Sequence, residues 1–244
     1  RCLVGSEMCI RDRFVIGGRD REQPETALNT IYMLDTTPDT DKMKWVSLPP
    51  FPGEGRILST AAVCDSTLFI IGGCSLSRDN SGETSRTYLS DMIGYDMTSK
   101  DPSKWGSSGR QQLAGPGMPV AAAAGPAPVR ENSILLIGGD KRGNSPDPSR
   151  PVAQSRDILV YDVIGNTWTR QGEWPVGIAT VPAVVRGSEI MTISGETAPG
   201  VRTPVNASAS AGYHFEMSTV DYAVLILTII VLAIIIVSAV RNGV

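Results

Sequence analysis

The sequence has little basic charge, a single histidine and few cysteines. Its 244 residues carry a net charge of -3 at pH 7, and Lys and Arg are not concentrated in one segment. Nucleic-acid binding needs a concentrated basic surface that displaces counterions from phosphate, so we expect no nucleic-acid partner. The one histidine, His214, stands beside an apolar segment near the C-terminus. The sequence therefore indicates neither a metal site nor a cofactor.

The cysteines do not indicate a disulfide framework. Two of the four lie in the first thirteen residues, which leaves Cys64 and Cys74 in the rest of the chain. If Asp65 and Ser66 form a hairpin turn, Cys64 faces Thr67 and is poorly placed to bond with Cys74. Two buried free thiols are therefore favoured over a disulfide.

The first thirteen residues, RCLVGSEMCIRDR, share no pattern with the sequence that follows. They show no periodicity, no capping pattern and none of the charged-then-apolar order of a signal peptide. They resemble a translated sequencing-library adapter, and the chain has no initiator Met. We therefore expect residues 1–13 to be an artefact, and the native sequence to start, in a truncated gene, at Phe14.

An apolar run lies near the other end of the chain. Ala223 to Val240, AVLILTIIVLAIIIVSAV, contains eighteen residues and no charge. At about 1.5 Å per residue it spans most of a hydrocarbon core of about 30 Å, which predicts a transmembrane helix within 218–244. Glu216 and Asp221 precede the run and Arg241 follows it. The positive-inside rule then places the preceding residues on the periplasmic or extracellular side of a cell membrane.

Between the two ends, the chain repeats a pattern of apolar stretches. Each stretch ends in a doublet of small residues, and the doublets are 55, 66 and 56 residues apart. The four stretches are FVIGG (Phe14 to Gly18), LFIIGG (Leu68 to Gly73), LLIGG (Leu135 to Gly139) and IMTISG (Ile190 to Gly195). A period of this length is typical of the blades of a β-propeller.

A tyrosine and then a tryptophan follow each of the first three doublets. These pairs are Tyr32 and Trp45, Tyr95 and Trp105, and Tyr161 and Trp168. One repeat therefore predicts four antiparallel strands, which we call a to d. Strand a is innermost, with Ser59 to Cys64 as an example, strand b ends in the doublet, strand c carries the Tyr and strand d the Trp.

The doublet, the Tyr and the Trp in this order resemble kelch repeats, from Phe14 to about Ser208. Paired glycines let crowded backbones approach, and the large aromatic residues fill the wedge between blades. An ordinary antiparallel β-sandwich is the alternative, but it does not require large residues at matching places in each period. We expect an all-β fold in which residues 14–217 form a partial kelch-type β-propeller, three to four blades of an expected six, followed by one transmembrane α-helix. Because a propeller sheet must close to protect its edges, this arc would be part of a larger ring.

The fourth repeat carries Ser194-Gly195-Glu196 where the others have paired glycines. Loops after strand b and before strand a share one face of a propeller, so Glu196 is expected at the mouth of its channel. Arg202 follows six positions later, across a Pro199-Gly200 turn. A carboxylate there can act as an acid or a base and a guanidinium can bind an anion, although a solvated surface pair is the alternative. Other charged loops, including Asp140-Lys141-Arg142, are interpreted as solvated turns.

The stretch GETAPGVRT, Gly195 to Thr203, resembles the Gly-Glu-x-x-Pro-Gly-hydrophobic-Arg stretch of the N-acetylneuraminate epimerases, or sialic acid mutarotases. These are six-bladed kelch propellers. Phe51 to Gly73 also resembles a blade of that family, including an Arg after Phe-Pro-Gly. The resemblance implies that Glu196 is the catalytic acid and base and Arg202 a substrate contact, with Arg56 as a third candidate on the same face. It also implies an acidic sugar as substrate and interconversion of its anomers.

Propellers of this kind also occur in front of sodium:solute symporters. STVDYAVLIL, Ser218 to Leu227, resembles the start of the first helix of those transporters, although the glycines and aromatic residues expected after Thr228 are missing. The resemblance implies a symporter domain that takes up the product. The alternative is a membrane-anchored propeller that binds carbohydrate or protein without catalysis. A copper enzyme like galactose oxidase is disfavoured, because the Cys, Tyr and His ligands are absent.

Overall fold

The chain divides into two compact units, Arg1–Ser210 and Ala211–Val244. The computed structural model describes residues 8–9, 12–23, 25–36, 40–78, 80, 82–99, 101–105, 118–119, 122–142 and 153–210, all in the first unit. Among these residues, no helix has the length and hydropathy needed to cross a membrane. The helix predicted within 218–244 and His214 lie outside the described residues, so these remain predictions.

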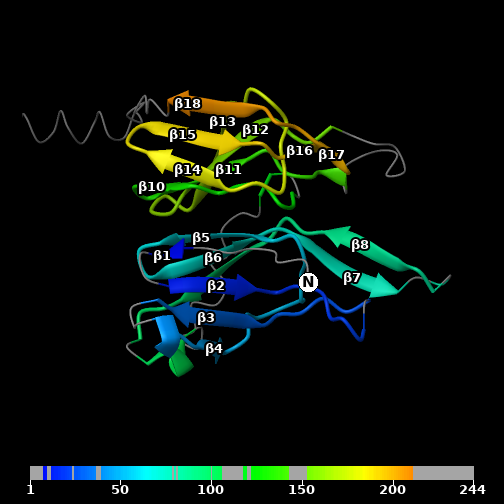
Figure 1. Cartoon of the computed structure of the whole chain (residues 1–244), viewed down its shortest axis with the longest axis vertical. Helices are drawn as coiled ribbons and strands as arrows, with labels where there is room; N and C mark the ends of the chain where they lie inside the picture. The colour runs from blue at the N-terminus through cyan, green and yellow to red at the C-terminus, as the bar shows by residue number, and fades with distance from the viewer. Residues whose placement is uncertain are drawn as a thin grey trace, which may run out of the picture. The chain divides into compact units, whose positions relative to one another are not determined.

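The described part is an all-β structure whose sheets follow one another in the order of the sequence repeats (Figure 1). The first sheet contains β1 (Met8–Cys9), β2 (Asp12–Ile16), β3 (Ile31–Asp35) and β4 (Trp45–Leu48), and the second contains β5 (Thr60–Cys64), β6 (Thr67–Ile71) and β9 (Met92–Asp96). The third contains β10 (Val129–Arg130), β11 (Ser133–Ile137), β12 (Asp157–Asp162) and β13 (Thr167–Glu173), and the fourth contains β14 (Ala183–Arg186), β15 (Glu189–Ile193) and β18 (Asn206–Ser210). Neighbouring strands pair antiparallel in every sheet.

Two hairpins interrupt the repeats between strands b and c. One is β7 (Cys74–Arg78) with β8 (Thr84–Tyr88) in the second repeat, and the other is β16 (Glu196–Ala198) with β17 (Val201–Arg202) in the fourth. In Figure 1 both hairpins extend from the same side of the sheets. Two short 3-10 helices, η1 (Thr40–Lys42) and η2 (Pro102–Lys104), lie in connecting segments.

The small-residue doublets directly follow the second strand of each sheet, as predicted. The first residue of a doublet has a left-handed backbone, with φ of 66° at both Gly138 and Ser194. A Cβ at Gly138 would lie 2.5 Å from the carbonyl oxygen of Ile178, in the loop before the next sheet. The following residue, Gly139, donates its N–H to that same oxygen at 2.8 Å. The doublets are therefore the points at which one repeat contacts the backbone of the next.

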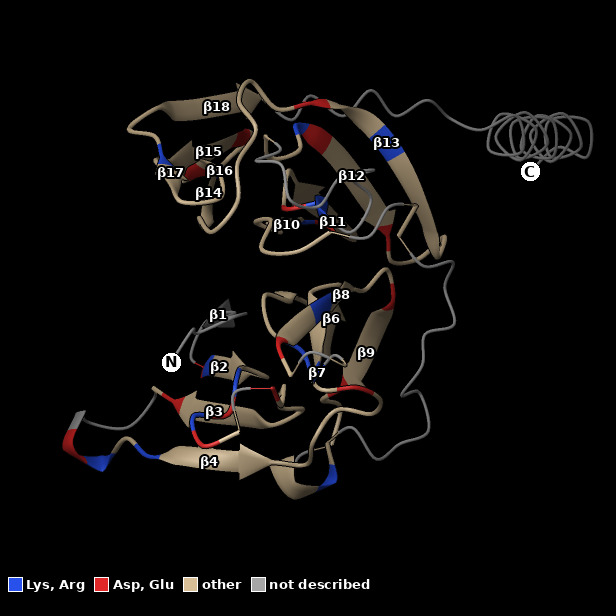
Figure 2. Cartoon of the chain, turned by 90° about the vertical axis from the view of Figure 1, so that its right-hand side faces the viewer, with Lys and Arg blue, Asp and Glu red and all other residues tan. Residues whose placement is uncertain are grey.

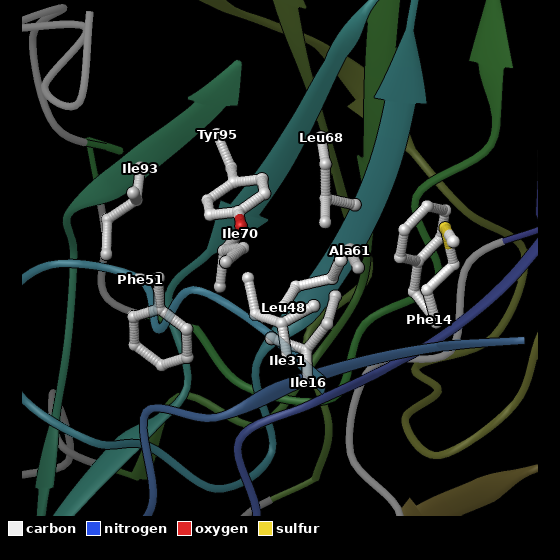
Figure 3. Packing of buried hydrophobic residues seen from close by; sticks show 11 residues of the cluster. Phe14, Ile16, Ile31, Leu48, Phe51, Ala61, Leu68, Ile70, Ile93 and Tyr95 are labelled. Carbon is white, nitrogen blue, oxygen red and sulfur yellow. The ribbon is translucent and has the colours of Figure 1, made fainter. Parts of the chain in front are cut away.

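The core lies between successive sheets. The cluster shared by the first two sheets is shown in Figure 3 and contains Phe14, Ile16, Ile31, Met33, Leu48, Phe51, Ala61, Leu68, Ile70, Ile93 and Tyr95. A second cluster joins the second and third sheets, where the ring of Phe69 meets that of Tyr161 with centroids 5.9 Å apart. Tyr95 and Tyr161 on strand c are fully buried, as the wedge-filling role predicts.

The predicted repeat is wrong in the first repeat and in the second. In the first, Tyr32 is 41% exposed and Trp45 is 52% exposed, so neither fills a wedge between described sheets. Trp105 does not lie on a fourth strand of the second sheet, because the 3-10 helix η2 precedes it and no fourth strand pairs with β9 in the described part of the chain. Its indole N–H instead donates to the carbonyl of Ser99 at 2.6 Å. The ring still packs against the first cluster, with its centroid 6.5 Å from that of Phe14. Trp105 thus fills the wedge without a strand.

The expected boundary at Phe14 falls inside a strand. β2 begins at Asp12, which pairs with Asp35, and Cys9 of β1 pairs in turn with Asp12. This register does not test where residues 1–13 come from, and their origin as an artefact remains a prediction. The expectation of free thiols is confirmed, since Cys64 and Cys74 are both unpaired and buried.

Candidate active site

One end of the sheets carries the loops after strand b and before strand a. The residues that follow the doublets in the last three repeats are Cys74, Asp140 and Glu196, and each forms an isolated antiparallel bridge with the loop before its own sheet, at Ile57, Ala123 and Ala179 respectively. We call this end, defined by these six residues, the mouth face. The antiparallel strands place the turns from strand a to strand b at the opposite end.

Backbone hydrogen bonds join neighbouring repeats at the mouth face. Leu58, Ala124 and Thr180 follow the three bridges and share a left-handed backbone, with φ of 56°, 57° and 56°. The N–H of Ala124 donates to the carbonyl of Leu58, and the N–H of Thr180 donates to that of Ala124, each at 2.8 Å. These hydrogen bonds join the second, third and fourth repeats to one another at the loops that carry the charged side chains.

The hairpin β16–β17 places Glu196 directly opposite Arg202. Nη2 of Arg202 lies 3.5 Å from Oε2 of Glu196, and Oε1 accepts a hydrogen bond at 3.1 Å from the N–H of Gly200, in the turn between the strands. Nη1 of Arg202 also reaches Oγ1 of Thr180 at 3.5 Å. In Figure 2 the acidic segment of β16 lies beside the basic segment of β17. The two residues singled out in the sequence are therefore brought together at the mouth face.

The two side chains differ in exposure. The side chain of Glu196 is 17% exposed, whereas that of Arg202 is 68% exposed. A mostly buried carboxylate held by a turn has a fixed position, which a group that exchanges protons with a ligand requires. An exposed guanidinium whose two contacts are both long, at 3.5 Å, can turn toward an anionic ligand and bind it through two parallel hydrogen bonds.

The third candidate, Arg56, has a different setting. Its side chain is 1% exposed, and Nη1 and Nη2 donate to the two carboxylate oxygens of Asp91 at 2.8 and 2.9 Å. Nη1 also donates to the carbonyl of Gly72 at 3.2 Å, and the guanidinium lies 5.5 Å from the centre of the Phe51 ring. These contacts all hold the second repeat together and do not involve Glu196. The geometry favours a structural role for Arg56, and its role as a substrate contact remains a prediction.

The comparisons with known proteins agree with the resemblance seen in the sequence. No family model matches the chain. It is 24% identical over 198 residues to an N-acetylneuraminate epimerase of Yersinia enterocolitica, a match that covers 70% of this chain and 47% of the relative. It is 26% identical over 201 residues to N-acetylneuraminate epimerase 1 of Escherichia coli, covering 72% of this chain and 50% of the relative. The chain is similar to N-acetylneuraminate epimerases. It spans about half the length of these curated relatives.

A solved structure has a similar fold. The structure of YjhT matches with a TM-score of 0.62 and 20% sequence identity, covering 85% of this chain and 62% of that chain. At this identity the likeness shows the fold alone. The all-β architecture is thus confirmed, and the likeness supports a kelch-type propeller.

One cluster on the mouth face was missed by the sequence analysis. The carboxylate of Asp140, interpreted as part of a solvated turn, is buried, and it accepts hydrogen bonds from Tyr88 at 2.7 Å and from Nη2 of Arg142 at 2.9 Å. Burial alone would raise the pKa of Asp140, but the hydrogen bonds from Arg142 and Tyr88 outweigh it and hold this pKa below its ordinary value. The interpretation as a solvated turn was wrong because Tyr88, the partner of Asp140, is 52 residues away.

Proposed function

We propose that this chain is part of a mutarotase that interconverts the anomers of a sialic acid. The single observation that supports the proposal most is the pairing of a mostly buried carboxylate, Glu196, with an exposed guanidinium, Arg202, at the mouth face. The names of the curated relatives, N-acetylneuraminate epimerases, point to the same reaction. The chain spans about half the length of these relatives, so mutarotase activity is proposed for the protein of which this chain is a part.

The reaction needs one group that takes and returns a proton. In the proposed cycle, the carboxylate of Glu196 takes the proton of the anomeric hydroxyl while the bond between the anomeric carbon and the ring oxygen breaks. Glu196 then gives the proton to the ring oxygen, which leaves an open-chain keto acid. Rotation about the next carbon–carbon bond and reversal of the same steps closes the ring with the hydroxyl on the other face. No proton is gained or lost overall, so one positioned carboxyl is sufficient.

Arg202 is proposed to hold the carboxylate of the sugar. A guanidinium binds a carboxylate through two parallel hydrogen bonds, which fixes both the distance and the orientation of the anomeric centre. The contact between Arg202 and Glu196 is long, at 3.5 Å, and joins only one oxygen of the carboxylate. Binding of the substrate would therefore replace a weak contact by a stronger one and leave Oε2 of Glu196 free to exchange protons.

The test is the substitution Glu196→Gln, which keeps the size of the side chain and removes its proton exchange. Anomer exchange of N-acetylneuraminic acid, measured by proton NMR, should fall to the uncatalysed rate in a variant that unfolds at the same temperature as the wild type. Undiminished exchange in a folded variant would remove Glu196 from the mechanism. Binding of the sugar by the wild type without accelerated exchange would favour the alternative, a propeller that binds carbohydrate without catalysis.

The membrane location and the coupling to a symporter are further parts of the proposal. They rest on the apolar run Ala223 to Val240 and on the resemblance of Ser218 to Leu227 to a transporter helix, both outside the described residues. A propeller outside the cell membrane could deliver the transported anomer to the importer. Sequencing of the gene beyond Val244 tests this: further apolar spans would support a symporter, whereas a stop codon would favour a simple anchor.

A further inference from the structure

The two hairpins of the mouth face occupy the same position in their repeats. In the second repeat Tyr88 pairs with Cys74, and in the fourth Arg202 pairs with Glu196. Tyr88 thus has the place that Arg202 has two repeats later. Its hydroxyl crosses to the third repeat and donates to Oδ2 of Asp140 at 2.7 Å. Asp140 in turn has the place that Glu196 has one repeat later.

A short path through the backbone connects the two acidic residues. Asp140 forms a bridge with Ala123. The carbonyl of the following residue, Ala124, accepts a hydrogen bond from the N–H of Thr180. Ala179, which precedes Thr180, forms a bridge with Glu196. The third and fourth repeats are also joined where the N–H of Gln154 donates to the carbonyl of Thr197 at 2.8 Å. The cluster around Asp140 therefore lies on the mouth face in the repeat next to Glu196.

Asp140 holds the guanidinium of Arg142 in a fixed position. Nε of Arg142 donates to both oxygens of Asp140, at 3.0 and 3.3 Å, and Nη2 donates at 2.9 Å. The N–H of Arg142 also donates to Oδ1 at 3.0 Å. The side chain of Asp140 is 9% exposed and that of Arg142 is 28% exposed. The guanidinium of Arg142 also lies close to the hydroxyl of Tyr88. Its hydrogen bonds to the carboxylate of Asp140 come from Nε and Nη2, so Nη1 is the candidate donor to a ligand.

The charges of the cluster fit a role in binding better than a role in proton exchange. Burial raises the pKa of Tyr88, and the hydrogen bond to Asp140 raises it further, so Tyr88 stays protonated near neutral pH. Arg142 is neutralised at close range by a carboxylate that stays ionised. A guanidinium in this state has little remaining attraction for an anion but still donates hydrogen bonds to uncharged oxygens. Arg202, whose two contacts with Glu196 and Thr180 are both long, remains the better anion ligand.

Resting on the proposed function, we propose that Arg142 is a second sugar-binding residue of this site, and that its Nη1 donates to the acyl carbonyl oxygen of a sialic acid whose carboxylate is held by Arg202. The amide carbonyl is the strongest uncharged acceptor on such a sugar. Arg202 would bind the carboxylate of the sugar and Arg142 would bind its amide carbonyl, and these two contacts on neighbouring repeats would orient the ring between them. Arg142 would then determine specificity for acylated sugars, and Asp140 and Tyr88 would be its positioning residues.

The test compares two sugars that differ in one group. N-acetylneuraminic acid carries an acylamino group at the position where 3-deoxy-glycero-galacto-nonulosonic acid carries a hydroxyl. Arg142→Met should raise KM for the first sugar about 10-fold, which corresponds to about 1.4 kcal/mol. KM for the second sugar should change by less than about two-fold, and kcat should be unchanged for both. An equal effect on both sugars, or no effect on either, would overturn the proposal.

Two further variants serve as controls. Because Arg142→Met leaves a buried carboxylate short of a partner, the double variant Asp140→Asn with Arg142→Met keeps the site neutral, and it should show the same dependence on the sugar. Arg186→Met removes an arginine from the end of β14, at the turn into β15 and thus opposite the mouth face, and should change neither KM. The proposal would also be overturned if the double variant folded and its KM values for the two sugars changed by the same factor relative to the wild type.

Direct binding separates this inference from the proposed function. Calorimetry measures the dissociation constants of both sugars for two proteins. One is the single variant Glu196→Gln, and the other is the double variant that carries Glu196→Gln and Arg142→Met. A 10-fold loss confined to the acylated sugar would support the role of Arg142 even if the wild type failed to accelerate exchange, which would refute only the mutarotase. Failure of the chain to bind either sugar would overturn the role of Arg142 as well.

Discussion

Gly72 lies against the backbone of Ala122, so closely that a Cβ on Gly72 would come within 2.3 Å of the Ala122 carbonyl oxygen. Gly72 also has a left-handed backbone, with φ of 54°. Gly72→Ala should therefore lower the free energy of unfolding by about 2–4 kcal/mol, the sum of backbone strain and a steric clash with the third repeat.

Gly200 provides the matched control for this substitution. It too has a positive φ, of 75°, but no atom lies within 4 Å of a Cβ placed there. Gly200→Ala should cost only the strain, about 1–2 kcal/mol. Urea denaturation of the two variants measures the difference. Equal losses would show that the backbone of the third repeat accommodates a Cβ at Gly72 without an added cost.

A second prediction concerns Arg56 and Asp91, whose exposures are very unequal. Asp91→Ala would leave a guanidinium that is 1% exposed without its carboxylate, at a cost of about 3 kcal/mol or more. Arg56→Met would leave only an aspartate that is 52% exposed and solvated, so the loss should be smaller. Chemical denaturation of both variants tests this order. A larger loss in Arg56→Met than in Asp91→Ala would contradict it.

The variant Arg56→Met also separates a structural role of Arg56 from a role in binding the sugar. If Arg56 only joins elements of the second repeat, a folded Arg56→Met chain keeps its KM for the sugar. A rise in KM without loss of stability would instead return Arg56 to the site, as the sequence resemblance implies.

The fold was largely predictable from the sequence because its repeat is encoded by local features. A doublet such as Gly138-Gly139 both ends strand b and permits contact with the next repeat, so its spacing gives the period directly. What failed was the assignment of one tryptophan per repeat. Trp174, which the repeat pattern did not include, is fully buried and donates to Oγ1 of Thr192 at 3.0 Å. The aromatic-Pro pair at Phe51-Pro52 and again at Trp174-Pro175 was the signal that could have identified it.

The site was predictable only where its partners are close in the chain. Glu196 and Arg202 meet because a tight turn at Gly200 joins their strands. They are only six positions apart, so the turn that brings them together can be recognised in the sequence. Arg56 and Asp140 have partners 35 and 52 residues away, on different loops. Whether such a charge is buried and paired depends on which loops the fold brings together, and spacing in the sequence carries no information on that.

A third prediction follows from the low pKa of Asp140. A carboxyl whose pKa in the folded chain lies below its unfolded value of about 3.9 stabilises the fold above that value, and this stability is lost as pH falls through the folded pKa. Asp140→Asn removes the carboxyl. The stability difference between wild type and variant should therefore be larger at about pH 6 than at about pH 3.

Urea denaturation at the two pH values measures this difference, and the substitution Tyr88→Phe supplies a check. Without the hydroxyl of Tyr88, the carboxyl of Asp140 loses one of the hydrogen bonds that stabilise its charged form. The pH dependence contributed by Asp140 should then shrink but not vanish, because Arg142 remains. A stability difference that is independent of pH would mean that Asp140 is not held ionised by these partners.

The last prediction concerns the charge that Arg202 would recognise. If its guanidinium holds the carboxylate of the sugar, Arg202→Met should raise KM for N-acetylneuraminic acid by about 10- to 100-fold, the range expected for loss of a charge-assisted hydrogen bond. Arg202→Lys should fall between the wild type and Met, because an ammonium keeps the charge but not the paired geometry. The methyl ester of the same sugar has no charge at this position, so its binding should be weak and equally weak in all three chains. Since the ester keeps every other group of the sugar, an Arg202→Met variant that lost affinity for the acid and the ester alike would assign to Arg202 a role in shaping the hairpin, and the anion would have to be held elsewhere on the mouth face.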